Sequence, residues 1–384
     1  MKGLLASALA LLLVIAAGCG GSNIHVGGGR VGPFLFMVGQ ASNSLFSFQG
    51  STAGSLSPIT SAATGQAPSA MAVEIFDTSE QNLYVTNAAS NNLTVVGVGP
   101  TSGMVTPSGI TIPVGTNPIA VGLRGPSGTL ISGQVDRGDL YVLNQGSNSI
   151  SAFRIADTAG HMTSIPGSPF ATQPNPQAMA VVTGGTSPTN LATFVYVGNG
   201  SLGTISGFKA NADGSLTEVP GSPFAAGANI TALTSPAGGV FLLASDSGSN
   251  AILGFKITQD TGAITPLAGS PFAAGTQPGA MVFAFNEFVY VANQGSNNIS
   301  GYKLDFPNNT LTALPGSPFP AGTTPVSLST VFNTQLYVAN QGSSDISGFN
   351  IDGATGGLTP MAGSPFHVPT APNAIQGLFI MNVD

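Results

Sequence analysis

The sequence has very few charged residues, and this scarcity excludes whole classes of function. Only 6% of the 384 residues are Asp, Glu, Lys or Arg, and the net charge is −7 with eight Lys and Arg in total. A surface that binds nucleic acid needs a dense basic patch, which so few cations do not form. We therefore predict no nucleic-acid partner. Tryptophan is absent, while Gly, Ser, Asn and Pro are abundant, as in turn-rich β-structure.

Cysteine and histidine are also scarce, which limits disulfides and metal sites. With Cys19 as the only cysteine, the chain has no disulfide and must be stable through packing alone. The three histidines, His25, His161 and His367, have no second His or Cys at the spacing of a metal site. We predict no metal and no cofactor. His367 follows a Gly-Ser-Pro-Phe turn on the face where ligands usually bind, so it is a candidate ligand contact or an exposed loop residue.

The N-terminal segment predicts export. Lys2 supplies a positive charge, Gly3–Ile15 is an apolar core too short to span a bilayer, and small residues precede Cys19. This junction resembles a bacterial lipobox, in which the cysteine is diacylated and becomes the new N-terminus. We expect a signal peptide at 1–18, a lipidated Gly-rich tether at 19–32, and a lipid-anchored protein in the bacterial cell envelope, at the outer membrane or cell surface. The alternative is an ordinary secretory signal with an incidental cysteine.

The mature chain repeats one pattern seven times, most clearly as VYVANQGSNNISGYKL from Val289 and LYVANQGSSDISGFNI from Leu336. The tyrosine-like position recurs every 45 to 57 residues, at Phe36, Tyr84, Tyr141, Tyr196, Phe241, Tyr290 and Tyr337. Each copy has an upstream P-x-A strand, a downstream aromatic strand and a fourth strand, which in five copies ends at a Gly-Ser-Pro-Phe loop. Alternating short strands with frequent turn residues predict an all-β fold. Four strands per repeat predict a β-propeller of seven four-stranded blades at 33–384.

The two ends of the chain are complementary. The first repeat opens at its second strand, near Pro33, and lacks a P-x-A strand. The segment Pro372–Asp384 has the missing strand and stops where the next tyrosine would fall. We predict that it forms the innermost strand of blade 1 and closes the ring, which removes exposed sheet edges.

The Tyr-Val-x-Asn strand ends and P-x-A strand starts resemble the YVTN-type repeat, and the domain is similar to the seven-bladed lactonase-like propellers that include 6-phosphogluconolactonase. The resemblance implies this fold and a possible lactonase activity. Members of that family have His, Arg and carboxylate residues in a central funnel. In this chain the residues after the P-x-A starts are apolar: Met71, Val121, Met179, Leu233, Met281, Leu328 and Ile375. No catalytic residue is predicted from them, and nucleophile-elbow, Walker and HExxH motifs are absent.

Most other charges are predicted to be surface residues. We predict solvated loop charges in the two insertions before Tyr84 and Tyr141, with a weak cation site as the alternative; the residues are Glu74, Asp77, Glu80, Asp136, Arg137 and Asp139. A cation recurs at one position of the third strands, at Arg154, Lys209, Lys256 and Lys303, and we predict a shared surface role.

A neutral polar rim is the most distinctive surface feature. The turns after the second strands should ring one mouth together with the Gly-Ser-Pro-Phe loops, although Asn and Gly are also what tight turns require. The candidate rim residues are Asn87, Asn144, Gln145, Asn199, Asn293, Gln294, Asn340, Gln341 and His367. Such a rim fits an uncharged glycan or a protein surface better than a phosphorylated metabolite, which requires clustered Arg or Lys.

Three functions stay open from the sequence. The first is a non-catalytic, membrane-tethered propeller that binds or scaffolds a protein or neutral glycan in the envelope; the shortage of catalytic motifs favours it. The second is a lactonase-like hydrolase related to 6-phosphogluconolactonase that acts on a sugar lactone; the resemblance favours it. The third is a purely structural role, since similar repeats can serve stability alone.

Overall fold

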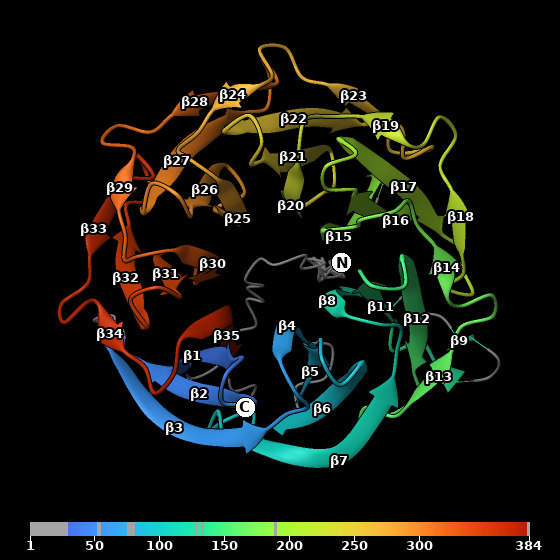
Figure 1. Ribbon diagram of the computed structural model, residues 1–384, viewed down its shortest axis with the longest axis horizontal. Helices are drawn as coiled ribbons and strands as arrows, with labels where there is room; N and C mark the ends of the chain where they lie inside the picture. The colour runs from blue at the N-terminus through green and yellow to red at the C-terminus, as the bar shows by residue number, and fades with distance from the viewer. Residues whose placement is uncertain are drawn as a thin grey trace, which may run out of the picture.

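The computed structural model describes residues 30–51, 55–74, 81–126, 130–131, 134–187 and 190–381. These residues form strands and no α-helix, and the strands build seven blades around one axis (Figure 1). The predicted seven-bladed β-propeller is therefore confirmed. The signal segment 1–18, Cys19, most of the tether with His25, and Asp77 and Glu80 lie outside the described residues. In the described part, no helix is long and apolar enough to cross a membrane.

The strands of each blade follow one another from the axis outward. Blade 1 consists of β35 (Pro372–Met381), β1 (Arg30–Gly39), β2 (Ser44–Gly50) and β3 (Leu56–Ala63). Blade 2 consists of β4 (Pro68–Val73), β5 (Gln81–Asn87), β6 (Asn92–Val98) and β7 (Val105–Pro113). Blade 3 consists of β8 (Pro118–Arg124), β11 (Asp139–Asn144), β12 (Ser149–Ile155) and β13 (Met162–Ser164) with β14 (Phe170–Ala171), beside a small hairpin of β9 (Leu130–Ile131) and β10 (Gln134–Val135).

The other four blades share one pattern. Blade 4 has β15 (Ala178–Ser187), β16 (Asn190–Gly198), β17 (Thr204–Ala210), β18 (Leu216–Glu218) and β19 (Phe224–Ala225). Blade 5 has β20 (Ile230–Thr234), β21 (Phe241–Asp246), β22 (Ala251–Ile257), β23 (Ile264–Pro266) and β24 (Phe272–Ala273). Blade 6 has β25 (Pro278–Ala284), β26 (Phe288–Asn293), β27 (Asn298–Asp305), β28 (Thr310–Ala313) and β29 (Phe319–Pro320). Blade 7 has β30 (Pro325–Val331), β31 (Gln335–Asn340), β32 (Asp345–Ile351), β33 (Leu358–Pro360) and β34 (Phe366–His367).

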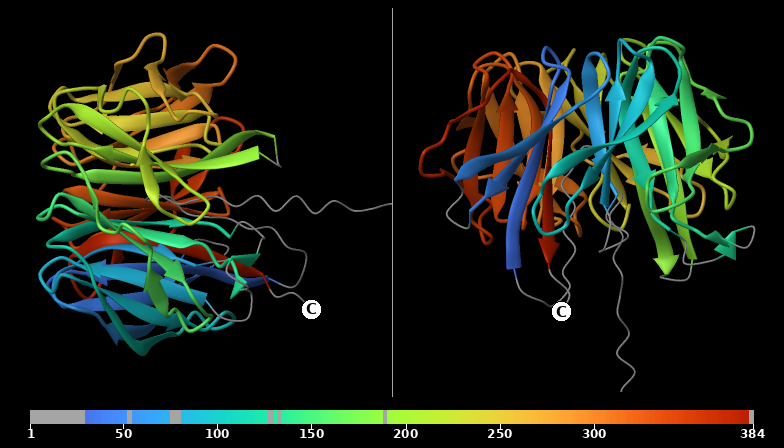
Figure 2. Two further views of the ribbon diagram at one scale, coloured as in Figure 1. Left: turned by 90° about the vertical axis from the view of Figure 1, so that its right-hand side faces the viewer. Right: turned by 90° about the horizontal axis from the view of Figure 1, so that it is seen from below.

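The ring closes through the two ends of the chain. Strand β35 pairs antiparallel with β1, so that Met37 lies opposite Ile375 and Arg30 opposite Met381. This confirms the predicted closure of blade 1 by the C-terminal strand. The start of β1 and the end of β35 consequently lie at the same face of the ring (Figure 2).

The Gly-Ser-Pro-Phe turns interrupt the outermost strand of blades 3 to 7. In blade 7, β33 and β34 both pair with β32, and the turn lies between them. Its Ser364 Oγ accepts a hydrogen bond from the Gly348 N–H at 2.9 Å, which satisfies a donor that the broken strand leaves open. The same bond recurs in blades 3 to 6 at 2.9 to 3.1 Å. The prediction that these turns ring the mouth was wrong, because they lie along the outer edge of the blades.

The repeat tyrosine links neighbouring blades. In blades 3, 4 and 6 its hydroxyl donates to the carbonyl of a glycine in the outer turn of the next blade, as in the bond from Tyr290 Oη to Gly356 O at 2.7 Å. Tyr141 and Tyr196 make equivalent bonds to Gly214 and Gly262. Burial raises the pKa of these hydroxyls above its ordinary value, which keeps them as donors.

The register corrects one position of the predicted repeat. In blade 5 the residue opposite the strand-3 glycine is Leu243, which pairs with Gly254 as Tyr290 pairs with Gly301. Phe241 instead matches Phe288, two residues earlier. The alignment on Phe241 chose the aromatic residue over the true register, in which a leucine replaces the tyrosine.

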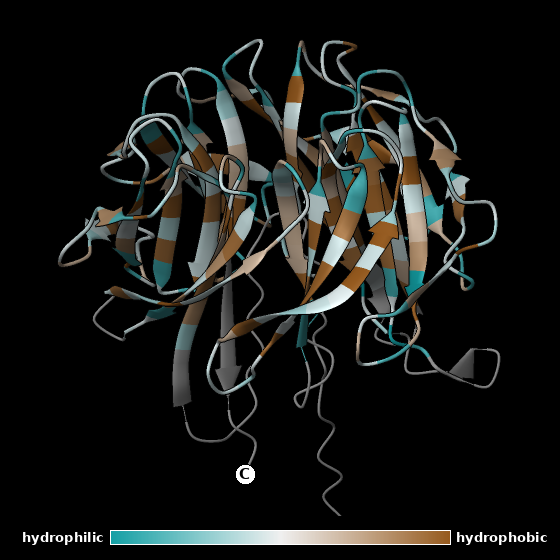
Figure 3. Ribbon diagram, turned by 60° about the horizontal axis from the view of Figure 1, so that its bottom comes forward, coloured by the Kyte–Doolittle hydropathy of each residue, from teal (hydrophilic) through white to brown (hydrophobic). Residues whose placement is uncertain are grey.

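Apolar residues fill the space between blades. One cluster joins Phe288 and Tyr290 of blade 6 to Leu328 and Val338 of blade 7, and others join the remaining neighbours around the ring. Apolar and polar bands alternate along the strands, as sheets packed face to face require (Figure 3). The blades therefore form a rigid frame for the loops at the two faces.

Candidate functional site

The two faces of the ring differ in charge. We call the end where the second strand turns into the third the amide face; its turns are 40–43, 88–91, 145–148, 200–203, 247–250, 294–297 and 341–344. Every Lys and Arg in the described part of the chain lies toward the other end, for example Lys303, which pairs with Phe288 at the start of β26. The only carboxylates at the amide face among these residues, Asp246 and Asp345, are buried. The amide face therefore exposes no carboxylate, lysine or arginine among the described residues.

Asparagines hold the turns of the amide face. Five asparagines of these turns adopt the left-handed conformation, with φ between 49° and 55°: Asn43, Asn91, Asn148, Asn250 and Asn297. Asparagine tolerates this region better than most residues. Each Oδ1 accepts a bond of 2.8 to 3.0 Å from a backbone N–H in the segment that enters the next blade. These bonds fix the position of the segment that precedes each innermost strand.

The structure places five of the predicted rim residues inside the blades. The five asparagines lie at the ends of the second strands, or one residue beyond in the case of Asn199, and are 0% exposed: Asn87, Asn144, Asn199, Asn293 and Asn340. Each Nδ2 donates to a side-chain oxygen on the third strand, such as Ser300 Oγ at 2.9 Å from Asn293. Their recurrence reflects this bond between strands. They are positioned to support the turns and do not reach the surface.

The predicted glutamines do lie at the mouth. Gln145, Gln294 and Gln341 follow these asparagines and are half-buried. Gln145 Oε1 accepts a bond from Asn117 Nδ2 at 2.9 Å, and Gln341 Nε2 donates to Asn373 Oδ1 at 3.1 Å. Two pairs of amides thus lie at this face, one in blade 3 and one between blades 7 and 1.

His367 is separate from these residues. It is exposed on β34, the outermost strand of blade 7, where its backbone pairs with that of Asp345. Its ring therefore belongs to the outer wall of the propeller at the amide face, and the structure does not bring it together with the glutamines.

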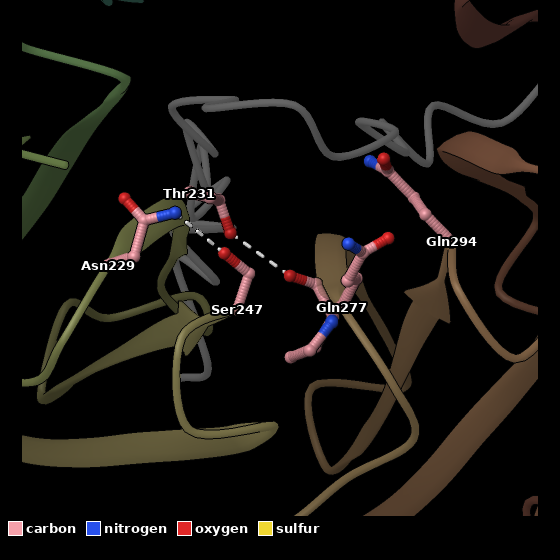
Figure 4. Close-up of a pocket in the computed structure, with 6 residues that line it drawn as sticks. Asn229, Thr231, Ser247, Gln277 and Gln294 are labelled. Atoms are coloured by element: carbon pink, nitrogen blue, oxygen red, sulfur yellow. Dashed lines mark hydrogen bonds between the residues drawn. The ribbon is translucent and has the colours of Figure 1, made fainter. Parts of the chain in front are cut away.

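A hollow of about 320 Å³ opens at the amide face between blades 5 and 6. Its walls are polar and uncharged, and they come from the starts of β20 and β25 and from the turns after β21 and β26; they are formed by Asn229, Thr231, Ser247, Gln277, Pro278 and Gln294 (Figure 4). Asn229 Nδ2 donates to Ser247 Oγ at 2.8 Å, and Thr231 Oγ1 donates to Pro278 O at 3.0 Å. The volume suits one sugar-sized ligand.

Sequence reasoning identified only Gln294 of this set. Asn229, Thr231 and Ser247 belong to blade 5, in which Leu243 and Asp246 replace the repeat tyrosine and asparagine, and Gln277 belongs to a variable segment before a P-x-A strand. The departure of blade 5 from the repeat was the signal that could have pointed to them.

The opposite face has a buried ionic network instead of solvated loop charges. Asp139 is 0% exposed and accepts bonds from Arg124 Nε at 2.6 Å and Arg154 Nε at 2.9 Å. Asp136 is also buried and lies 3.9 Å from Arg124 Nη2. The predictions of solvated charge for Asp136 and Asp139 were therefore wrong, and Arg154, predicted at the surface, is half-buried with 18% of its side chain exposed.

The same network continues into blade 2. Glu74 is 1% exposed, so its predicted solvation was also wrong; it accepts a bond of 2.5 Å from Tyr84 Oη and lies 3.9 Å from Arg137 Nη1. Lys209, Lys256 and Lys303 are exposed as predicted, and Lys303 pairs with Glu287 at 3.3 Å. Across the described ranges, no three His, Cys, Asp or Glu residues are arranged to hold a metal ion.

Comparisons with known proteins agree with this architecture. The family model described as "Lactonase, 7-bladed beta-propeller" matches residues 15–122, 192–328 and 287–374. A search of curated protein sequences finds no match.

Similar solved structures include the periplasmic gluconolactonase of Pseudomonas aeruginosa, with a TM-score of 0.70 at 17% identity over 91% of this chain and 99% of that one. A 6-phosphogluconolactonase candidate from Bacteroides fragilis gives 0.71 at 17% identity over 90% and 98%. Another, from Bacteroides uniformis, gives 0.72 at 16% identity over 90% and 99%. At these identities the likeness shows a shared fold.

Proposed function

Because the chain belongs to the seven-bladed lactonase β-propeller family, we propose that it is a lactonase-like hydrolase that acts on an uncharged sugar lactone at its amide face. In this reaction water adds to the lactone carbonyl carbon, the bond from that carbon to the ring oxygen breaks, and the ring oxygen takes up a proton. The product is the open hydroxy acid.

The absence of exposed charge at the described amide face favours a neutral lactone over a phosphorylated one. Tight recognition of a phosphate uses Arg or Lys side chains, and the described amide face has neither. Amides and hydroxyls match the hydroxyl groups of a neutral sugar instead. The structural neighbour from Pseudomonas aeruginosa is named for gluconolactone, a sugar lactone without a phosphate.

The side chains that line the hollow can bind a lactone and polarise its carbonyl group, but they are poorly suited to transfer a proton. The hydroxyl of Ser247 and the amide N–H groups of Gln277 and Gln294 can donate to the lactone carbonyl oxygen, where negative charge develops as water attacks. Asp246 lies behind this wall, but its oxygens already accept four hydrogen bonds. We therefore assign it no role as a base.

The test is hydrolysis of D-glucono-1,5-lactone by the purified protein, followed by acid release in a pH-stat and compared with the spontaneous rate. We expect acceleration with this lactone and a kcat/KM at least about tenfold lower with its 6-phosphate, because the face offers the phosphate no cation. A preference for the phosphorylated lactone would contradict the proposal.

A non-catalytic binding module is the second candidate, because none of the six described lining residues is an acid or base near neutral pH. A neutral sugar derivative that raises the melting temperature, without any lactone being hydrolysed faster than in buffer, would favour this candidate and the envelope scaffold over the hydrolase.

We further propose that Cys19 is lipidated and tethers the propeller to a membrane of the cell envelope. Arg30 starts β1 at the face opposite the amide face (Figure 2), and a chain of ten residues, 20–29, reaches at most about 35 Å. A tether of this length would leave the amide face open to ligand. Two acyl chains suffice for stable anchoring.

Replacing Cys19 with serine should move the protein from the membrane fraction to the soluble fraction, or leave it unprocessed at a higher mass. Ser22→Ala, just beyond the junction, is the matched control and should stay membrane-bound. Unchanged fractionation of Cys19→Ser would reject the lipid anchor.

A further inference from the structure

Blade 5 departs from the repeat at the end of its second strand. In five other blades the asparagine at this point donates its Nδ2 to an oxygen seven residues later, at 2.8 to 2.9 Å. In blade 5 this residue is Asp246, and Leu253 replaces the hydroxyl acceptor. A carboxylate has no proton to donate, and leucine has no atom to accept a hydrogen bond. Both partners of the repeat hydrogen bond are therefore replaced in blade 5, and neither is left without its partner.

Asp246 turns toward the amide face instead. Its carboxylate accepts bonds from the backbone N–H of Ala228 at 2.9 Å and of Asn229 at 2.8 Å, and from Gly248 N and Ser249 Oγ. Burial opposes its ionisation, but these donors outweigh burial and hold the pKa of Asp246 below its ordinary value. Asp246 therefore fixes the Asn229 segment as one wall of the hollow.

The facing wall, in blade 6, also departs from its relatives. Gly279 occupies the second position of the P-x-A start, where the other blades have a side chain: Ser69, Ile119, Gln177, Thr231, Val326 and Asn373. A Cβ added at Gly279 would come within 2.7 Å of Gln294 Nε2. The missing side chain thus leaves room for the Gln294 amide at the edge of the hollow.

The two glutamines at the hollow have unpaired side-chain amides. Gln145 and Gln341 bond to Asn117 and Asn373. Within the described structure, the side-chain amides of Gln277 and Gln294 have no hydrogen-bond partner. Together they offer donors and acceptors on one side of the hollow, opposite the Ser247 hydroxyl (Figure 4).

We infer that the hollow between blades 5 and 6 is the specificity subsite of the amide face, where Gln277, Gln294 and Ser247 bind the carbonyl oxygen and the hydroxyl groups of one uncharged sugar ring. Neighbouring hydroxyls of a sugar both donate and accept, as carboxamides do, so they supply the partners that the two glutamines lack. The inference rests on the proposed function for the lactone class of the ligand, and it adds where the ring binds and which residues select it. Asp246 acts as a positioning residue for this subsite.

The experiment measures binding of D-glucono-1,5-lactam, a neutral ring that water does not open readily, to the full mature protein by calorimetry. Gln294→Ala and Gly279→Ala should each weaken binding about tenfold, the equivalent of one hydrogen bond. Gly279→Ala displaces only the flexible end of Gln294, so its melting temperature should match that of the unaltered protein. The matched control is Gln145→Ala, at the same turn position in blade 3, where Ala88 stands in blade 2; its affinity should stay within about twofold.

The outcomes separate this inference from the proposed function. If the unaltered protein binds the lactam and hydrolyses the lactone, but Gln294→Ala and Gly279→Ala bind as tightly as Gln145→Ala, the subsite lies elsewhere and the inference alone is overturned. If the unaltered protein neither binds the lactam nor accelerates hydrolysis, the proposed function fails, and this inference fails with it.

Discussion

Replacing Asp139 with alanine should lower the free energy of unfolding by about 3–5 kcal/mol, because it leaves two largely buried cations without their shared partner. Asp139 is completely buried between Arg124 and Arg154, and the latter comes from the third strand of the same blade. The guanidinium groups are only partly exposed, with side-chain exposures of 11% for Arg124 and 18% for Arg154. They can therefore regain only part of their hydration when the carboxylate is removed.

Urea unfolding followed by far-ultraviolet circular dichroism measures this effect, since the chain has no tryptophan. The matched control is Glu287→Ala, which removes the carboxylate of an ion pair with the exposed Lys303 and should cost less than about 1 kcal/mol. A loss below about 1 kcal/mol for Asp139→Ala as well would mean that water reaches the two arginines and that the network does not stabilise blade 3.

The fold could be predicted from the sequence because the repeat encodes it seven times. Each strand needs only a short run of apolar residues and a turn, and the partial copies at the two ends identify each other. Ring closure could be predicted because β1 lacked an inner neighbour and Pro372 started a strand without a tyrosine strand after it. The one misaligned copy, blade 5, has Leu243 where the others have an aromatic residue, and the nearby Phe241 was aligned in its place.

The positions of charges could not be predicted in the same way. Asp139 begins β11 and Glu287 immediately precedes β26, yet Asp139 is fully buried and Glu287 is paired at the surface. The difference comes from Arg124, at the end of β8, and from the blade 4 turn whose Gly214 packs against Asp139. Both contacts join segments distant in sequence, which a local pattern does not record.

The sequence predicted that the rim would be neutral and rich in amides, but it did not identify which residues reach the surface. A turn asparagine such as Asn297 and a buried asparagine such as Asn293 look alike in the sequence, since both are polar and recur in register. Only the structure separates the amide that holds the turn from the one that bonds to the third strand. The hollow itself depends on side chains that are smaller than the repeat predicts, Ser247 and Gly279, so its signal lies in departures from the pattern.

Removing β35 by ending the chain at Ala371 should destabilise the whole ring. Strand β35 supplies the inner partner of β1, and it also joins blade 7 to blade 2: Ile375 N donates to Ser327 Oγ at 3.2 Å, and Asn373 Nδ2 donates to Pro68 O at 3.3 Å. Its loss leaves β1 with an unpaired edge and exposes the apolar residues that pack against Ile375.

Several ladder hydrogen bonds at about 1 kcal/mol each, together with this burial, amount to roughly 5 kcal/mol or more. For a domain of this size the melting temperature should fall by roughly 7 °C or more, measured by circular dichroism. A chain that ends at Met381 keeps β35 and should melt like the full protein, and adding the peptide 372–384 to the shortened chain should restore part of the loss. If the melting temperature of the shortened chain were unchanged, the ring would be held by contacts between blade faces alone, and the pairing of the two ends would contribute nothing to stability.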